Sequence, residues 1–187
     1  MAPRTRRSDL RLCPIMPAHA PAMFRWMKDP AVRLGVGIRT EASLERTLEW
    51  IAQARLPGSG VWGFAILVGE RHVGNVVLDR FDGHLSTARL SIYIGEPDER
   101  GRGVGRCAVR EALAHAFDSL KLFKVWLTVH DENVAARRTY LSLGFQEEGR
   151  LRGEFLLEGR RVDAIYMGIL AEEFVTREQL AARGEAR

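Results

Sequence analysis

The period of the apolar positions changes along the chain, and this change separates the expected strands from the expected helices. Trp62, Phe64, Ile66 and Val68 are two residues apart, and a Gly-Glu turn leads from them into the apolar run 73–78. Because side chains alternate between the two faces of a strand, this spacing predicts a β-hairpin. Further strands are expected at 10–15, 88–95, 124–130, 145–149 and 161–170.

Other segments repeat their apolar positions at steps of three and four residues, which is typical of helices with one buried face. Leu44, Leu48 and Ile51 follow this spacing, as do Ala112 and Ala116. We expect helices at 18–28, 40–55, 103–120, 134–143 and 171–182. Strands and helices alternate without internal repeats, so the chain is predicted to be one α/β domain, a mixed sheet covered by helices.

The composition agrees with a folded domain and with small anionic ligands. The chain has 187 residues, of which 46% are hydrophobic and 28% charged, and its net charge is only +4. That is enough apolar surface for one sizeable core. Acidic residues are interspersed with the arginines, which argues against a dedicated nucleic-acid surface. We expect a flexible basic tail over 1–8, the main domain over 9–173, and a C-terminal helix or tail over 174–187.

The sequence indicates a cytoplasmic protein. It has no apolar run of the roughly 20 residues that a membrane-spanning helix needs, and its first residues lack the apolar core of a secretory signal. Cys13 and Cys107 fit no metal-ligand spacing, and we expect both to be reduced and buried. No membrane contact and no metal are therefore expected.

The stretch DERGRGVGR, residues 98–106, is a candidate anion site. It connects the strand ending at Gly95 with a helix that begins near Gly103. A helix start exposes unpaired N–H groups and the positive end of the helix dipole, and glycines let an anion approach the backbone. The residues alone also allow a simple turn with solvated arginines.

Two familiar phosphate motifs fit this stretch poorly. A P-loop needs Gly-Lys followed by Ser or Thr, and no such triplet is present. Residues 103–108 match the alanine variant of the dinucleotide fingerprint, and Asp131 lies at a suitable distance. However, eight residues separate Ile94 from Gly103, and only 56 residues follow Asp131, too few for the rest of a dinucleotide domain.

A second candidate segment is NVAARRTYLSLGF, residues 133–145. Asn133 is expected to cap a helix, and Gly144 is expected to end it in the left-handed conformation. Asn133 and Tyr140 are seven residues apart, so they lie within about 20° of each other on one helix face and about 10 Å apart along the axis. Either the two side chains share a functional site, or Asn133 only caps the helix and Tyr140 only packs.

Together the two segments resemble a known family. IGEPDERGRGVGR, with Arg100, Gly103 and Gly105, is similar to the acyl-CoA pyrophosphate loop of the GNAT superfamily of N-acetyltransferases. Residues 133–145 are similar to the second cofactor-side motif of that family, at the same distance of about thirty residues. The flanks over 10–170 resemble the RimJ/RimL-type branch, which contains ribosomal-protein N-terminal and spermidine acetyltransferases. The resemblance implies a single-domain GNAT fold, α/β (α+β), with a mostly antiparallel sheet that splays at the acyl-CoA site.

The resemblance also implies roles for individual residues, with acetyl-CoA as co-substrate. Tyr140 would be the general acid that protonates the departing thiolate, for which a phenol with a pKa near 10 is well matched. Asn133 would border the pantetheine arm. The cofactor-binding residues implied are Ile92, Tyr93, Ile94, Arg100, Gly101, Arg102, Gly103, Val104, Gly105, Arg106, Asn133 and Ala136.

The base and the amine acceptor are less constrained. Glu154 is the favoured base, and Glu96, Ser91, His72, His84 and His130 stay open. The main prediction is acetylation of a protein N-terminal amine. Polyamines, aminoglycosides and amino sugars are alternative acceptors. The segments expected to frame the acceptor, 34–40 and 155–161, carry no acidic cluster typical of a polyamine site. A non-catalytic acyl-CoA-binding regulator, an RNA- or ribosome-associated module and a homodimer also stay open.

Overall fold

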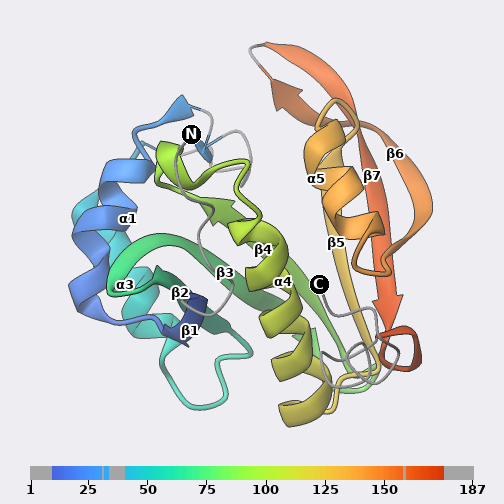
Figure 1. The fold of residues 1–187 in the computed structure, drawn as a ribbon, viewed down its shortest axis with the longest axis horizontal. Coiled ribbons are helices and arrows are strands. Elements are labelled where there is room, and N and C mark those ends of the chain that lie inside the picture. Colours follow the sequence, from blue (N-terminus) through green and yellow to red (C-terminus); the bar gives the residue numbers. More distant parts are fainter. Residues whose placement is uncertain (1–9, 31, 34–40, 158, 175–187) are drawn as a thin grey trace.

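A seven-stranded sheet organises the chain in this computed structural model, which describes residues 10–30, 32–33, 41–157 and 159–174 (Figure 1). The strand order is β1-β2-β3-β4-β5-β7-β6. Neighbours pair antiparallel, except for β4 and β5, which are parallel. The mixed, mostly antiparallel sheet is thus confirmed. The strands are β1 (Leu10–Pro14), β2 (Trp62–Val68), β3 (Arg71–Asp82), β4 (Thr87–Ile94), β5 (Lys124–His130), β6 (Gln146–Leu157) and β7 (Arg160–Leu170).

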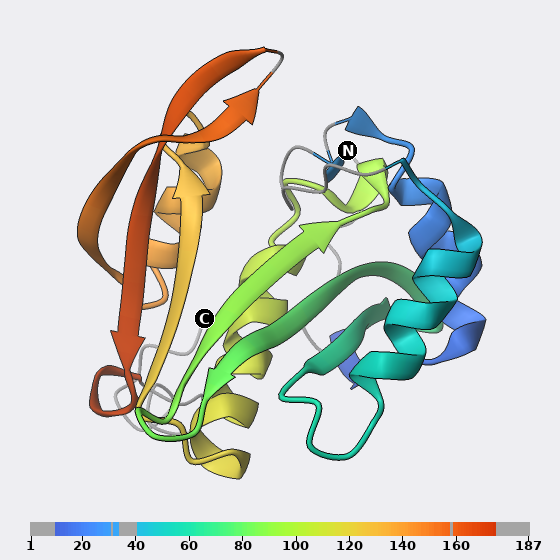
Figure 2. The ribbon, with the colours of Figure 1, turned by 180° about the vertical axis from the view of Figure 1, so that it is seen from behind.

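Helices cover the two halves of the sheet differently. One face carries α4 (Val104–Ala114) and α5 (Val134–Leu141), and the opposite face of the N-terminal half carries α1 (Ala20–Trp26) and α3 (Leu44–Ala54) (Figures 1 and 2). Short turns of helix flank them: η2 (Pro17–His19), η3 (Pro97–Glu99), η4 (His115–Ser119) and η5 (Ala171–Glu173). The N-terminal half therefore has three layers and the C-terminal half two.

Two apolar clusters hold these layers together. The larger joins α4 and α5 to the sheet and includes Val109, Leu113, Leu127 and Phe145, all almost completely buried. The smaller joins α1 and α3 to the other face and includes Met23, Trp26 and Ile51. Removing this much apolar surface from water is the main favourable contribution to folding. Tyr93 of β4 packs against the smaller cluster, so β4 lies between the two cores.

The sheet splits between β4 and β5. Their pairing covers only Thr87–Arg89 with Lys124–Trp126, and beyond these residues the two strands diverge (Figure 2). On its other side, β4 stays paired with β3 as far as Gly74 and Ile94. The edge of β4 that faces β5 is therefore free of strand pairing over residues 90–94.

Several predicted boundaries need correction. The hairpin of β6 and β7 extends well beyond the predicted strands, since bulges between 147 and 149 and between 151 and 155 keep it paired. The predicted helix 103–120 changes at His115 into a π-helix. Of the predicted helix 171–182, η5 is described, while 175–182 and the basic tail 1–8 lie outside the described residues. Cys13 and Cys107 are free thiols, but both are partly exposed rather than buried.

Candidate active site

The loop between β4 and α4 takes the shape that an anion site requires. Gly101 and Gly103 have φ values of +74° and +86°, a backbone conformation in which glycine avoids the strain of other residues. Gly103 is the N-cap of α4, and no side chain caps the helix there. The side chain of Val104 is buried in the larger core, so this residue offers only its backbone N–H to a ligand. The start of α4 thus keeps its N–H groups for another acceptor.

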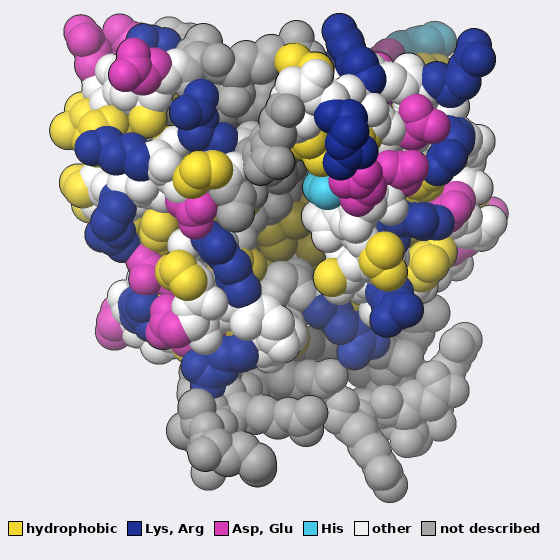
Figure 3. Space-filling view, turned by 90° about the horizontal axis from the view of Figure 1, so that it is seen from above, with side chains coloured by type: hydrophobic (Ala, Val, Ile, Leu, Met, Phe, Trp, Pro, Cys, Tyr) yellow, Lys and Arg dark blue, Asp and Glu magenta, His cyan; other side chains and the backbone are white. Residues whose placement is uncertain are grey.

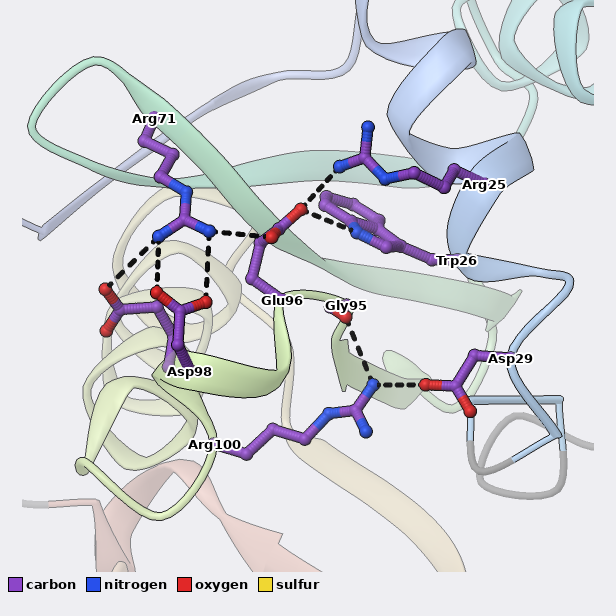
Figure 4. Close-up of polar contacts among 9 residues, drawn as sticks. Arg25, Trp26, Asp29, Arg71, Gly95, Glu96, Asp98 and Arg100 are labelled. Carbon is purple, nitrogen blue, oxygen red and sulfur yellow. Dashed lines mark hydrogen bonds and ion pairs between the residues drawn. The ribbon is translucent and has the colours of Figure 1, made fainter.

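The arginines of the loop lie in different places. Arg100 donates from Nε to the Ile94 carbonyl at 2.9 Å and from Nη2 to the Gly95 carbonyl at 3.1 Å, and it pairs with Asp29 at 2.7 Å (Figure 4). Its guanidinium is therefore directed toward the protein backbone. Arg102 lies 3.6 Å from a carboxylate oxygen of Glu99.

Arg106 links the two motifs that the sequence singled out. From the first turn of α4 it donates to the Ser142 carbonyl at 3.4 Å, two residues beyond Tyr140. Its Nε is buried and has no hydrogen-bond partner among the described residues. The glycine-arginine loop and the asparagine-tyrosine helix, about thirty residues apart in sequence, are therefore neighbours across the split in the sheet.

On β4, the three predicted residues point to both faces of the sheet. Ile92 and Ile94 pack against the larger core beneath α4, while Tyr93 lies on the face of α1, with its ring 6.0 Å from that of Trp26. The Tyr93 hydroxyl accepts a hydrogen bond from Asn75 Nδ2 at 2.5 Å, and burial raises its pKa. Because backbone groups alternate sides along a strand, those of Ile92 and the Ile94 N–H face the split and are left for a ligand. The backbone groups of Tyr93 face β3, and the Ile94 carbonyl accepts from Arg100 Nε.

The helix α5 has the predicted ends. Asn133 is the N-cap, and its Oδ1 accepts from the N–H of Ala136 at 3.1 Å. Gly144 has a φ of +100°, as predicted for the residue that ends the helix in a left-handed conformation. The ring of Tyr140 packs against Phe145 at 5.6 Å, and burial raises the pKa of its hydroxyl to about 12. Within the described residues this hydroxyl has no hydrogen-bond partner, so it stays protonated and free to donate.

The predicted base residues are distributed over the molecule. Glu154 is exposed on β6. His72 Nε2 lies 2.8 Å from Asn75 Oδ1, and burial lowers its pKa, while His130 packs edge-on against Phe155. Ser91 is partly buried on β4, and His84 is exposed in a turn. Both oxygens of Glu96 accept hydrogen bonds from neighbouring residues. The predicted acceptor segment 34–40 lies outside the described residues.

A cleft follows the split in the sheet. Seen from above, it separates the two halves of the molecule, with hydrophobic side chains on its floor and charged side chains along its rims (Figure 3). A separate hollow of about 460 Å³ lies beside α5 and β6, and none of the predicted site residues lines it. No group of three potential metal ligands and no helix apolar enough to cross a membrane occurs in the described part of the chain.

Sequence reasoning missed the residues that hold the loop. Arg25, Trp26 and Asp29 of the α1 region and Arg71 of β3 all bind its side chains (Figure 4). Arg71 is 25 residues from Glu96 and Arg25 is 71, and no local spacing connects positions so far apart. The one signal was the density of charge in the loop itself.

Comparison with known proteins identifies the family. Residues 9–146 match the model of the acetyltransferase (GNAT) domain. A spermidine N(1)-acetyltransferase of Escherichia coli is 28% identical in an alignment that covers 90% of this chain and 84% of the relative. A spermidine N(1)-acetyltransferase of Vibrio cholerae is 37% identical in an alignment that covers 50% of this chain and 53% of the relative. The crystal structure of the Vibrio cholerae spermidine N-acetyltransferase in complex with CoA and spermine superposes with a TM-score of 0.82 at 26% identity, covering 89% and 98% of the two chains.

The chain belongs to the GNAT acetyltransferase family and has its fold. It is an N-acetyltransferase with acetyl-CoA as co-substrate. The predicted fold class, enzyme class and co-substrate are thereby confirmed. The relatives above are named for spermidine rather than for a ribosomal protein, which favours the alternative acceptor over the main prediction of a protein N-terminus.

Proposed function

We propose that this enzyme transfers the acetyl group of acetyl-CoA to a primary amine of a polyamine. The observation that carries the proposal is the split between β4 and β5, bordered by the glycine loop at the start of α4 and by Tyr140 of α5. The acceptor class rests on the relatives reported above, which are named spermidine acetyltransferases and one of which has a crystal structure in complex with CoA and spermine.

The loop supplies the anion-binding part of the proposed site. The N–H groups of Gly101, Gly103, Val104 and Gly105 bind the pyrophosphate of the co-substrate, where the positive end of the α4 dipole favours negative charge. Arg102 and Arg106 add positive charge. Arg100 was predicted to frame the same anion, and its contacts with Ile94, Gly95 and Asp29 support a role in shaping the loop instead.

The unpaired edge of β4 receives the pantetheine arm in this proposal. The backbone groups of Ile92 and the Ile94 N–H, which point away from β3, pair with the amides of the arm, and an N–H there stabilises the oxyanion that forms when the amine attacks the thioester. Asn133 and Ala136 border the arm from α5. Because the Ala136 N–H already binds Asn133 Oδ1, Ala136 contributes a small side chain rather than a donor.

Tyr140 is the proposed general acid. The neutral amine forms a bond to the acetyl carbon, the carbon–sulfur bond breaks, and the phenol gives its proton to the departing thiolate. A pKa of about 12 keeps this phenol protonated at neutral pH. Glu154 remains the proposed base: its carboxylate is exposed on the β6–β7 hairpin, where it can take a proton from the amine directly or through water.

The acceptor is tested by comparing amines under identical conditions. The protein is incubated with acetyl-CoA and either spermidine or a short peptide with a free N-terminus, and thiol release is followed. We expect kcat/KM for spermidine to exceed that for the peptide by about tenfold or more, a difference of about 1.4 kcal/mol. Faster turnover of the peptide contradicts the polyamine assignment, and CoA binding without turnover of any amine contradicts the enzyme.

A further inference from the structure

Glu96, the second residue after β4, accepts three hydrogen bonds from side chains outside the loop between β4 and α4. Its Oε1 accepts from Arg25 Nη2 at 2.5 Å and from Trp26 Nε1 at 2.9 Å, and its Oε2 accepts from Arg71 Nη2 at 2.7 Å (Figure 4). Only 14% of this side chain is exposed. The three donors come from α1 and from the start of β3, so one carboxylate joins two elements to the first residue after Gly95.

Arg71 extends this contact along the loop. It binds both oxygens of Asp98, at 2.7 and 3.0 Å, and lies 4.0 Å from Glu99. Glu99 is 8% exposed and in turn lies 3.6 Å from Arg102. The bonds of Arg71 to Asp98 are charge-assisted hydrogen bonds, which are shorter and stronger than neutral ones, while the two contacts of Glu99 are longer ion pairs. A continuous series of ion pairs thus runs from Glu96 to the residue before Gly103.

The residues around Gly95 and Arg100 of the loop also contact β3 and the α1 region. The N–H groups of Gly95 and Glu96 both donate to the Val73 carbonyl, at 2.8 and 3.1 Å. A Cβ atom at Gly95 would lie 2.0 Å from the Trp26 indole, so glycine is required for the ring to rest on the backbone. The pair of Arg100 with Asp29 adds a second connection to the α1 region.

These contacts argue against Glu96 as the base. Burial alone raises the pKa of its carboxyl, but the hydrogen bonds from Trp26, Arg25 and Arg71 outweigh that effect and lower it. To accept a proton from an amine, the carboxylate would have to give up at least one of these bonds. Of the three donors, Trp26 is buried, and leaving its N–H without an acceptor is unfavourable.

We propose that Glu96 is a positioning residue that holds the loop over residues 96–103 in the shape that binds the pyrophosphate of the co-substrate, and that it does so by joining this loop to α1 and β3. This inference rests on the proposed role of the loop in binding pyrophosphate. The loop has few bonds of its own, chiefly Glu99 N–H to the Glu96 carbonyl and Arg100 N–H to the Pro97 carbonyl. Its N–H groups stay directed toward one anion because side chains from outside hold the loop at Glu96, Asp98 and Arg100.

The test uses two thioesters that differ in the pyrophosphate. Glu96→Gln is compared with the wild type in CoA binding by calorimetry and in turnover of spermidine with acetyl-CoA and with S-acetylpantetheine, which lacks the pyrophosphate. We expect the Kd for CoA and the KM for acetyl-CoA to rise about tenfold. The kcat with acetyl-CoA and the kcat/KM for S-acetylpantetheine stay within about twofold of the wild type, because the loop does not contact the shorter substrate.

Glu70→Gln is the matched control. Glu70 is the neighbour of Arg71 and pairs with Arg11, but 92% of its side chain is exposed. An exposed pair of this kind contributes little, so the Kd for CoA stays unchanged in this variant. Arg71→Met is the second test variant, since it removes the bonds to Glu96 Oε2 and to Asp98 and leaves those from Arg25 and Trp26. We expect it to weaken CoA binding in the same direction by a smaller factor.

Each remaining outcome overturns a particular step. Unchanged CoA binding in folded Glu96→Gln overturns the inference, as does an equal loss of kcat with both thioesters, which indicates a base. If thermal unfolding shows that Glu96→Gln is not folded, Arg71→Met tests the inference in its place. The inference fails if Arg71→Met binds CoA as the wild type does. A wild-type protein that binds S-acetylpantetheine but gains no affinity from the pyrophosphate of CoA instead contradicts the proposed role of the loop.

Discussion

The two motifs that carry the family resemblance are built in opposite ways. The loop between β4 and α4 is surrounded by charge, with Arg71, Arg100 and Arg102 all in ion pairs with acidic neighbours. The helix α5 holds one phenol, Tyr140, among apolar side chains, and its hydroxyl has no polar partner among the described residues. One region fixes a backbone by many polar bonds, and the other keeps a single proton in apolar surroundings.

The difference follows from the chemistry that each region is proposed to perform. Backbone N–H groups bind an anion well only when their directions are set in advance, since a mobile loop would have to be ordered on binding. A general acid needs the reverse, because a nearby cation would stabilise the phenolate and release the proton early. The apolar environment of Tyr140 raises its pKa instead.

Replacing the phenol tests the α5 side of this comparison and has the largest expected effect. In Tyr140→Phe, kcat with acetyl-CoA falls about 100-fold, because the thiolate then leaves without an acid. The Kd for CoA stays within about twofold, since the ring still packs on Phe145. Thiol release and calorimetry measure the two quantities.

Tyr166→Phe is the control for that variant. The ring of Tyr166 stacks on Trp126 with the centroids 5.1 Å apart, and we expect this variant to turn over normally. Unchanged kcat in Tyr140→Phe sinks the acid assignment.

Changing the backbone of the loop tests the other side and has the next largest effect. Gly103→Val places a β-branched side chain at a φ of +86°, where such residues are strained, and it obstructs the approach of the pyrophosphate. We expect the Kd for CoA to rise about tenfold or more, as measured by calorimetry.

Gly58→Val supplies a matched comparison for the loop. Gly58 has a φ of +75°, and a Cβ atom there would meet no atom within 4 Å, which is also true of Gly103. Both variants therefore lose similar amounts of stability from backbone strain, and only Gly103→Val loses affinity. Equal CoA affinities in the two variants refute the role of Gly103.

The dependence of turnover on pH tests the role of Tyr140 in the unaltered protein. A phenol with a pKa of about 12 remains protonated up to about pH 10. Tyr140 therefore causes no decline in kcat/KM for acetyl-CoA between about pH 7 and 10, while deprotonation of the amine raises the rate over this range. A descending limb below about pH 10 that disappears in Tyr140→Phe contradicts this expectation.

The smallest expected effect is the change in the free energy of unfolding with pH, which depends on titratable residues near α1. Burial lowers the pKa of His72, so the unfolded chain binds a proton there at a higher pH than the folded protein does. The free energy of unfolding therefore decreases as the pH falls through the unfolded value near 6.5. Glu96 and Asp98, whose pKa values are also lowered, contribute only at lower pH, near and below their unfolded values.

Urea unfolding at about pH 7.5 and about pH 5.5 separates these contributions. We expect the wild type to lose stability between the two, and His72→Phe to lose less, because it removes one of the groups that gain a proton on unfolding. Burial also lowers the pKa of His19 and of His115, which account for the loss that remains in the variant. His84, exposed in a turn, is the control position, and His84→Gln should follow the wild type. An equal loss in wild type and His72→Phe contradicts the assignment to His72.

Features set by neighbouring residues were predictable from the sequence. The strand 124–130 was predicted at its observed bounds, because its side chains alternate between the buried core and a more exposed face. Asn133 caps α5 and Gly144 ends it, since caps and left-handed turns depend on the residue type at one position. The two motifs also led to the family, the fold and the co-substrate.

Features that depend on contacts between distant residues required the tertiary structure. Arg100 pairs with Asp29 and Glu96 with Arg25, each 71 residues away in the sequence, and periodicity carries no information about such contacts. The length of the β6–β7 hairpin depends on two bulges, at which the register shifts and beyond which the two strands stay paired.

The sequence by itself thus determined most of the helices and strands and the two segments that carry the family resemblance, because glycines, caps and apolar spacing act over a few residues. Only the tertiary structure decided which acidic side chains and carbonyls the arginines around the loop contact, because a charged side chain can reach any element that folding brings beside it.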